Sequence, residues 1–172
     1  KHYLEKVTDS SVDVIRNNEL DLDEIEKYDA VVLSPGPGLP ENAGLLMPLI
    51  KRYKEKKRML GVCLGHQAIA LSYGAKLINL ANVVHGEATQ IQVHSNTSLF
   101  CGLPQIFKVG RYHSWVVEEA ELPKELTCLS SDENGNVMAF QHQSLPLFGV
   151  QFHPESILTE HGLEIIRNWL GV

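Results

Sequence analysis

Short hydrophobic segments alternate with polar segments along the chain, and their spacing predicts the secondary structure. Residues 30–34 (AVVLS) are apolar at successive positions, which is typical of a parallel strand that is covered on both faces. From about residue 42 to residue 57, apolar side chains recur every three to four positions and predict an amphipathic helix. Residues 160–170 repeat this helical period. Strands and helices thus alternate in the N-terminal half, and a further helix is predicted at the C-terminal end of the sequence.

The C-terminal half is richer in strands. A compact helix is predicted at residues 65–73, ended by Gly74. Further strands are predicted at 11–15, 59–62, 75–80, 89–93, 107–112, 126–131, 137–142 and 147–151, separated by turns such as Asn134-Gly135. Together these elements predict an α/β fold with a mixed, mostly parallel central sheet flanked by helices.

Length and charge exclude several classes of protein. The 172 residues suffice for one domain with its own core. The chain has 15 Lys and Arg against 21 Asp and Glu. This net charge of −6 argues against sequence-independent binding to nucleic-acid phosphates. No apolar run approaches the about 18–20 residues of a membrane helix. We therefore expect neither a nucleic-acid partner nor a membrane partner.

The cysteines indicate a reducing compartment. Cys63, Cys101 and Cys128 are odd in number, far apart and without a CxxC pair, so they fit neither a disulfide scaffold nor a zinc site. The eight histidines are scattered rather than set at metal-ligand intervals. We expect a cytoplasmic protein with no metal and no other cofactor in this subunit.

The sharpest local pattern is GVCLG at residues 61–65, between a predicted strand and a predicted helix. It matches a nucleophile elbow with Cys63 in place of the commoner serine. Flanking glycines avoid clashes across the strained turn, and the positive end of the following helix favours a thiolate. The alternative is a buried structural cysteine, the role expected for Cys101 and Cys128. The context favours a nucleophile at Cys63.

A thiol nucleophile needs a base, and the base needs an orienting partner. His153 and Glu155 stand where an apolar strand stops at Pro154. Residues two apart in extended backbone point the same way, and the proline keeps His153 extended. The alternative is a surface histidine beside an acid. Combined with the elbow cysteine, the pair indicates a general base and its orienter.

Residues 34–38 (SPGPG) follow a buried strand and cannot continue it. Glycines there let a ligand approach free backbone amides, which can hold a carbonyl oxygen as it becomes an oxyanion. The phosphate-binding patterns G-x-x-x-x-G-K-[ST] and G-x-G-x-x-G are absent from the sequence. An ordinary Pro/Gly turn is the alternative.

Taken together, SPGPG, GVCLGHQ, VVHGE, GRYHSW and VQFHPES resemble the class I (triad-type) glutamine amidotransferases over about residues 1–170. SPGPG and the HGE segment are most similar to the small subunits of anthranilate synthase and aminodeoxychorismate synthase. The resemblance implies a single flavodoxin-like domain over residues 1–172. It further implies hydrolysis of L-glutamine to glutamate and ammonia through a Cys thioester. The ammonia would pass to a chorismate-binding synthase large subunit in a heteromer.

The resemblance also implies residue roles. Cys63 would be the nucleophile, His153 the base and then the acid, and Glu155 the orienter. Backbone amides of Gly36 and Leu64 would form the oxyanion hole, and the glutamine pocket would be lined by Gly36, Pro37, Gly38, Gln67, Ser114 and Trp115. We expect the catalytic face to be the docking face as well, with residues 85–87 and 112–114 near the contact. For HGE, a simple turn is the alternative.

Two positions depart from the family pattern. The family begins with a strand and an Asp-Asn-Tyr-Asp-Ser-Phe-like loop that are absent here, so we expect the first strand to be missing from this sequence. The residue after YHS is often Leu but is Trp115 here. Backbone contacts to glutamine would tolerate that change.

Several alternatives remain open at this point. One is another Cys–His hydrolase of related fold, such as a peptidase or a deglycase. A second is a non-catalytic binding or regulatory subunit, against which Cys63, His153 and Glu155 argue. A third is an amidotransferase subunit serving a different synthase. GMP synthase usually lacks the SPGPG form, and carbamoyl-phosphate synthase carries an extra N-terminal domain. The sequence leaves open whether the partner places nitrogen at the ortho or the para position.

Overall fold

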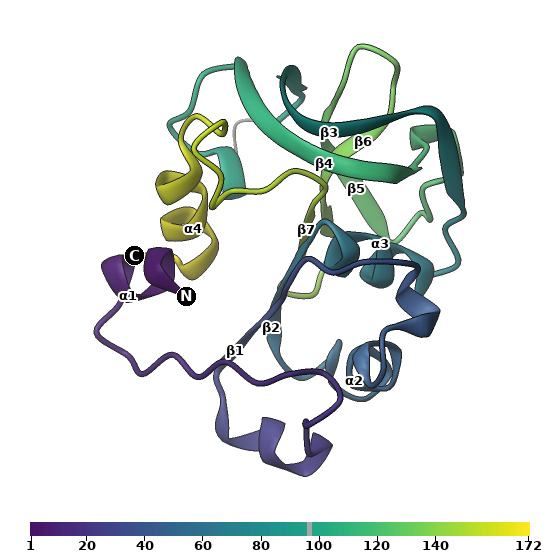
Figure 1. Cartoon of the computed structure of the whole chain (residues 1–172). Helices are drawn as coiled ribbons and strands as arrows, with labels where there is room; N and C mark the ends of the chain where they lie inside the picture. The colour runs from purple at the N-terminus through teal and green to yellow at the C-terminus, as the bar shows by residue number, and fades with distance from the viewer. Residues whose placement is uncertain (96–97) are drawn as a thin grey trace.

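One seven-stranded sheet runs through the described residues, in the order β1-β2-β7-β6-β5-β3-β4 (Figure 1). The structure is a computed structural model that describes residues 1–95 and 98–172, without the side chains of residues 82–85 and 98. The strands are β1 (Ala30–Leu33), β2 (Arg58–Val62), β3 (Leu77–Val93), β4 (Ile106–Val117), β5 (Leu126–Ser131), β6 (Val137–His142) and β7 (Leu147–Val150).

The sheet is mixed, as predicted, but the prediction that it is mostly parallel was wrong. Only β1–β2 and β2–β7 pair in parallel among the described strands, while β7–β6, β6–β5, β5–β3 and β3–β4 are antiparallel. A parallel pair needs a crossover, which a helix supplies between β1 and β2. Most of the later strands pair with the strand next to them in sequence, β3 with β4, β5 with β6 and β6 with β7, and these pairs are antiparallel.

Helices cover both faces of the sheet (Figure 1). They are α1 (His2–Val7), α2 (Leu46–Tyr53), α3 (Leu64–Leu71) and α4 (Gly162–Leu170), with 3₁₀ segments η1 (Leu22–Lys27), η2 (Pro40–Asn42), η3 (Ser98–Phe100) and η4 (Glu119–Glu121). α2 and α3 pack with one apolar cluster, which includes Met59 of β2, and α4 packs with a second, which includes Leu60. Adjacent strand residues thus point to opposite faces, as the pleat requires.

The structure corrects several predicted boundaries. The helix expected at 42–57 is confined to α2, because η2 and a turn occupy residues 40–45. The strands expected at 75–80 and 89–93 are parts of one long β3, whose ladder with β4 continues through two irregularities in register. Residues 11–16, all of them described, form no strand, and Val14 is 72% exposed. The apolar alternation there lacks a neighbouring strand to bond with.

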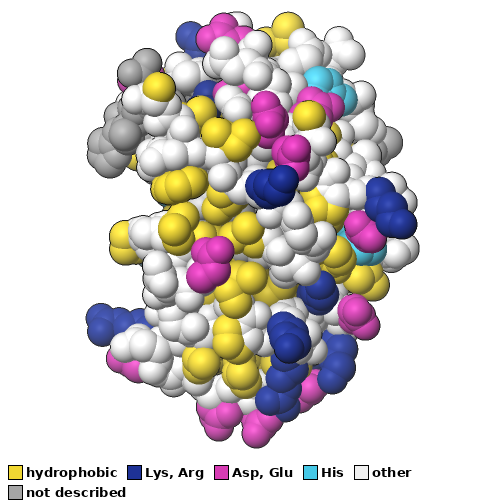
Figure 2. Space-filling view, turned by 90° about the vertical axis from the view of Figure 1, so that its right-hand side faces the viewer, with side chains coloured by type: hydrophobic (Ala, Val, Ile, Leu, Met, Phe, Trp, Pro, Cys, Tyr) yellow, Lys and Arg dark blue, Asp and Glu magenta, His cyan; other side chains and the backbone are white. Residues whose placement is uncertain are grey.

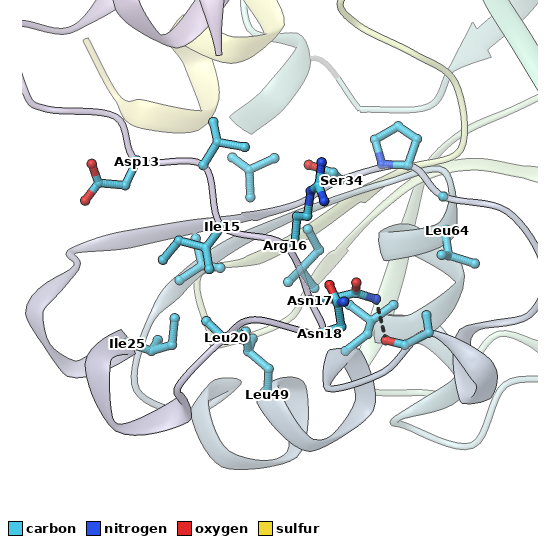
Figure 3. A pocket seen from close by; sticks show the side chains of 18 of the residues that line it. Asp13, Ile15, Arg16, Asn17, Asn18, Leu20, Ile25, Ser34, Leu49 and Leu64 are labelled. Carbon is cyan, nitrogen blue, oxygen red and sulfur yellow. Dashed lines mark hydrogen bonds between the residues drawn. The ribbon is translucent and has the colours of Figure 1, made fainter.

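A cavity of about 600 Å³ separates residues 13–18 from β1 (Figure 3). Ile15, Ile25 and Leu49 are among its apolar lining residues, and Asn17 Nδ2 closes one side by donating to the Ala43 carbonyl at 2.8 Å. On the molecular surface, hydrophobic side chains gather along the middle of one face, and charged side chains of both signs border them (Figure 2). Within the described part of the chain, no helix has the length and apolarity to cross a bilayer.

Candidate active site

Cys63 occupies a strained turn between β2 and α3. Its φ is 52° and its ψ is −99°, and among the described non-glycine residues only His161 shares a positive φ. A Cβ on Gly65 would lie 2.3 Å from the Leu33 carbonyl oxygen, and one on Gly61 would lie 2.4 Å from the Gly65 carbonyl. Both glycines are therefore required for the close approach, as the elbow pattern predicts.

His153 lies just past β7 and is held from two sides. Its Nδ1 is 2.9 Å from Glu155 Oε1, and its backbone N–H donates to the Gly110 carbonyl at 3.1 Å. The Tyr112 ring packs edge-on against the imidazole at 4.8 Å between centroids. Nε2 makes no hydrogen bond of good geometry to a described residue, but it interacts with Cys63 and is the nitrogen left for exchange of a proton with the sulfur.

The electrostatics of this group favour the imidazolium. Burial disfavours the charged ring, but the interactions with Cys63 and Glu155 outweigh it and raise the pKa of His153 to about 9. Burial likewise disfavours the Glu155 carboxylate, yet the hydrogen bond with His153 leaves the pKa of Glu155 below its usual value. Near neutral pH the pair is therefore a charged imidazolium and carboxylate beside Cys63.

A small pocket of about 160 Å³ opens beside the nucleophile. All the residues to which the family resemblance gives a role in glutamine binding line it, and Tyr112 and His113 complete the wall. The lining residues are Gly36, Pro37, Gly38, Cys63, Leu64, Gln67, Tyr112, His113, Ser114 and Trp115. His153 is not among the lining residues, but it interacts with Cys63 and its ring packs against that of Tyr112, and both of these residues line the pocket. The structure thus brings together segments from β1, the elbow, β4 and the end of β7.

The β4 wall of this pocket is fixed by a buried polar network. Arg111 Nη1 lies 2.9 Å from Asp132 Oδ2, and both side chains are almost fully buried. Arg111 Nε donates to His113 Nε2 at 3.1 Å, which leaves His113 Nδ1 to donate to the Trp115 carbonyl at 3.1 Å. Burial, reinforced by Arg111, lowers the pKa of His113 to about 4, so this ring stays neutral.

Sequence reasoning missed Gln151, whose side chain is fully buried beneath the site. Its Nε2 donates to Cys63 Sγ at 3.6 Å, and its Oε1 accepts from Gln67 Nε2 at 3.1 Å. A signal for it was present: Gln151 stands two positions before His153, and extended backbone points such residues to the same side. A polar residue within the apolar strand segment needed a buried partner.

One group of described residues could offer three ligands to a metal ion, away from this pocket. His94, Glu119 and Cys128 place one ligand atom each within 4.8 Å of one another. His94 and Glu119 are exposed, and burial raises the pKa of the Cys128 thiol to about 12. None of the three lines the pocket at Cys63.

Residues 1–171 match the model of the family described as glutamine amidotransferase class-I. The chain belongs to this family. Anthranilate synthase component 2 of Pseudomonas aeruginosa is 41% identical over 168 residues, which cover 94% of this chain and 83% of that protein. Aminodeoxychorismate/anthranilate synthase component 2 of Bacillus subtilis is 40% identical over 159 residues, which cover 91% and 81%.

Other relatives differ in length or in the activity that their names give. The bifunctional protein TrpGD of Thermotoga maritima is 43% identical over 166 residues, but the match spans 95% of this chain and 28% of that longer protein. Among solved structures, a Thermoplasma acidophilum protein described as a candidate GMP synthase subunit superposes with a TM-score of 0.87 at 28% identity, covering 99% of this chain and 84% of that one. These neighbours confirm the fold of a class-I amidotransferase.

Proposed function

We propose that this amidotransferase domain hydrolyses L-glutamine and supplies ammonia to a chorismate-using synthase component. The observation that supports this most is the Cys63 elbow, with the His153–Glu155 pair beside a pocket of about 160 Å³. A pocket of that size suits a free amino acid better than a peptide chain. It therefore favours a glutaminase over a peptidase of related fold.

The first chemical step is attack of the Cys63 thiolate on the side-chain amide carbon of glutamine. The oxyanion is held by the backbone N–H groups of Gly36 and Leu64, whose donors cost no reorganisation at the moment of reaction. His153, as the imidazolium, protonates the departing nitrogen so that ammonia leaves. The product of this step is a γ-glutamyl thioester on Cys63 with a neutral His153.

The second step releases glutamate. His153 removes a proton from water, and the hydroxide attacks the thioester carbon through the same oxyanion hole. The carbon–sulfur bond breaks, Cys63 returns as the thiolate, and His153 is again protonated. Across both steps, one glutamine and one water give one glutamate and one ammonia. The protein's own groups supply every proton transfer.

Ammonia in water is largely protonated near neutral pH and is then a poor nucleophile, so delivery to a docked partner makes chemical sense. We place the docking face on the β3–β4 hairpin beside the pocket. His85 pairs with Tyr112 and Glu87 with Arg111 along this ladder, so the two motif segments lie on adjoining strands. The side chain of His85 is outside the described residues, whereas Glu87 is exposed. With all three cysteines free, a reducing cytoplasm is the proposed location.

Reconstitution tests this function. The chain is mixed with the large subunit of anthranilate synthase or of aminodeoxychorismate synthase, and the glutamine-dependent product is measured in each mixture. We expect product with at least one large subunit, loss of it in Cys63→Ala, and its retention in Cys101→Ser, a control at an exposed free thiol. Product formation by Cys63→Ala, or glutamine left intact with both partners, would contradict the proposal.

A different synthase is the second candidate, and the likeness to the candidate GMP synthase subunit of Thermoplasma acidophilum favours it. The same assay therefore includes the synthetase component of GMP synthase. Glutamine-dependent amination by that component alone would move the assignment to a purine partner while leaving the glutaminase chemistry intact.

A further inference from the structure

Two buried glutamines connect the pocket wall to the nucleophile. Gln67 on α3 is 3% exposed and Gln151 after β7 is fully buried. Gln67 Nε2 donates to the Trp115 carbonyl at 2.8 Å and to Gln151 Oε1 at 3.1 Å, and Gln151 Nε2 lies 3.6 Å from Cys63 Sγ. We infer that this amide chain supplies a fixed hydrogen-bond donor to the Cys63 thiolate, with Gln151 as donor and Gln67 as its positioning residue. The inference rests on the proposed role of Cys63.

The amide chain has only one workable orientation. The Trp115 carbonyl can only accept, so it selects the amino group of Gln67. That amino group in turn selects the carbonyl oxygen of Gln151 as its acceptor. The remaining end of the Gln151 amide, its NH₂ group, must then face the sulfur. Reversing Gln67 would set its oxygen against the Trp115 and Gln151 oxygens, and reversing Gln151 would set two amino groups against one another. Either change leaves buried polar groups without partners.

A donor in this place matters more for the thiolate than for the thiol. A hydrogen bond to an ionised acceptor is about twice as strong as one between neutral groups, and exclusion of water strengthens it further. The Gln151 amide therefore favours ionised Cys63 and fixes the direction in which its lone pairs point. Its donor state does not change with pH, unlike that of His153.

The contribution of the Gln151 amide to the thiolate is judged against the titratable groups around Cys63. They are His153 and Glu155 after β7, Tyr112 and His113 on β4, and His66 on α3. Burial lowers the pKa of His66 to about 3 and that of His113 to about 4, so both rings are neutral near the elbow at physiological pH. The imidazolium of His153 and the amide of Gln151 then stabilise the thiolate together with the N-terminus of α3, which begins directly after Cys63.

The amide chain begins at Trp115, in the β4 wall that lines the pocket. A shift of this carbonyl would free the Gln67 amide, and the Gln151 amide would lose the partner that orients it. The position of the β4 wall is in this way transmitted to the nucleophile through two side chains. Partner docking at β4 can thus tune the thiolate without contacting it.

The test is the pH dependence of Cys63 alkylation by iodoacetamide, followed by mass spectrometry of the Cys63 peptide. Gln151→Met keeps the volume but removes the donor, and a charge-assisted hydrogen bond corresponds to a rise of about one pH unit in the profile midpoint. Gln67→Met should shift the midpoint in the same direction by less. Gln151→Glu, which puts a carboxylate beside the thiolate, should raise it further.

Gln143→Met is the matched control, because that amide is exposed and bonds only to the Lys124 carbonyl in the described structure. Its profile should coincide with that of the parent chain. An unchanged midpoint in folded Gln151→Met overturns the inference, and so does an unchanged midpoint in Gln151→Glu or Gln67→Met if the first variant does not fold. Shifted midpoints in a chain that hydrolyses no glutamine would instead contradict the proposed function and leave the amide chain standing.

Discussion

At the scale of single residues, the site depends on two side chains that contact the catalytic groups, Glu155 at His153 and Gln151 at Cys63. Glu155 holds one imidazole nitrogen at 2.9 Å, and Gln151 donates to the sulfur at 3.6 Å. The sequence predicted Cys63, His153 and Glu155, because the elbow glycines and the strand-ending proline carry local signals. It did not reveal Gln151, because the amide's partner Gln67 is 84 positions away and only the fold brings them together.

Glu155→Gln tests the role of the orienting carboxylate. Burial alone would lower the pKa of His153, so loss of Glu155 should lower it from about 9 toward neutrality. The imidazolium that protonates the departing amide nitrogen is then lost at lower pH, and the alkaline limb of kcat should move to lower pH. Because Glu155 is partly exposed, we expect kcat to fall by about 10- to 100-fold at pH 8. A glutaminase pH–rate profile checks this, and an unmoved alkaline limb would contradict it.

At the scale of elements, the elbow and the β4 wall are held by contacts that tolerate little change. Pattern reasoning recovered α3, α4 and the strands that flank the elbow, since their periods and glycines are local. It failed for residues 11–15, because apolar alternation makes a strand only where another strand pairs with it. It also failed on strand direction in the second half, since short runs of alternation do not distinguish parallel from antiparallel pairing.

Gly65→Ala should destabilise the elbow. Its Cβ would meet the Leu33 backbone carbonyl at 2.3 Å, and a backbone neighbour has little room to move. The expected loss in the free energy of unfolding is about 1–3 kcal/mol or more, measured by urea denaturation. Gly36→Ala is the matched control, because its Cβ would meet only the flexible end of Leu64, at 2.9 Å. Equal losses in the two variants would show that the close helix–strand approach does not limit stability.

Asp132→Ala should break the buried network behind the pocket wall. Asp132 pairs with Arg111 at 2.9 Å and also accepts hydrogen bonds from Asn134 and Asn136, so its loss leaves a buried guanidinium without a counter-charge. We expect a loss of about 3–5 kcal/mol in the free energy of unfolding. The exposed pair of Lys76 and Glu121 offers the comparison, where Glu121→Ala should cost less than about 1 kcal/mol. A loss below about 1 kcal/mol for Asp132→Ala would mean that the network does not hold β4.

At the scale of the whole molecule, the sheet divides into a parallel part that carries the nucleophile and an antiparallel part that forms the pocket wall. Cys63 and His153 follow β2 and β7, which are parallel neighbours, so both side chains emerge at the same edge. Tyr112 to Trp115 come from β4 at the far end of the strand order. The sequence placed both segments in one site only through a family resemblance, because no local pattern specifies which distant strands meet.

The docking surface belongs to this scale. Glu87 is exposed on β3 opposite Arg111, beside the pocket, and Glu87→Lys reverses a charge on the proposed contact. We expect the Kd for the synthase large subunit to rise about tenfold, which corresponds to about 1.4 kcal/mol. Titration calorimetry measures it, with Asp9→Lys as an equally charged change at an exposed position near the N-terminal helix. Equal Kd values for the two variants would remove β3 from the interface.

The central claim is that Cys63 attacks glutamine, and covalent trapping tests it most directly. The chain is incubated with a diazoketone analogue of glutamine, and its intact mass and peptide map are recorded. We predict one added analogue fragment per chain, located on Cys63, slowed by excess glutamine and absent after Cys63→Ala. Stoichiometric labelling of Cys101 or Cys128 in place of Cys63, or labelling of Cys63 that excess glutamine does not slow, would contradict it.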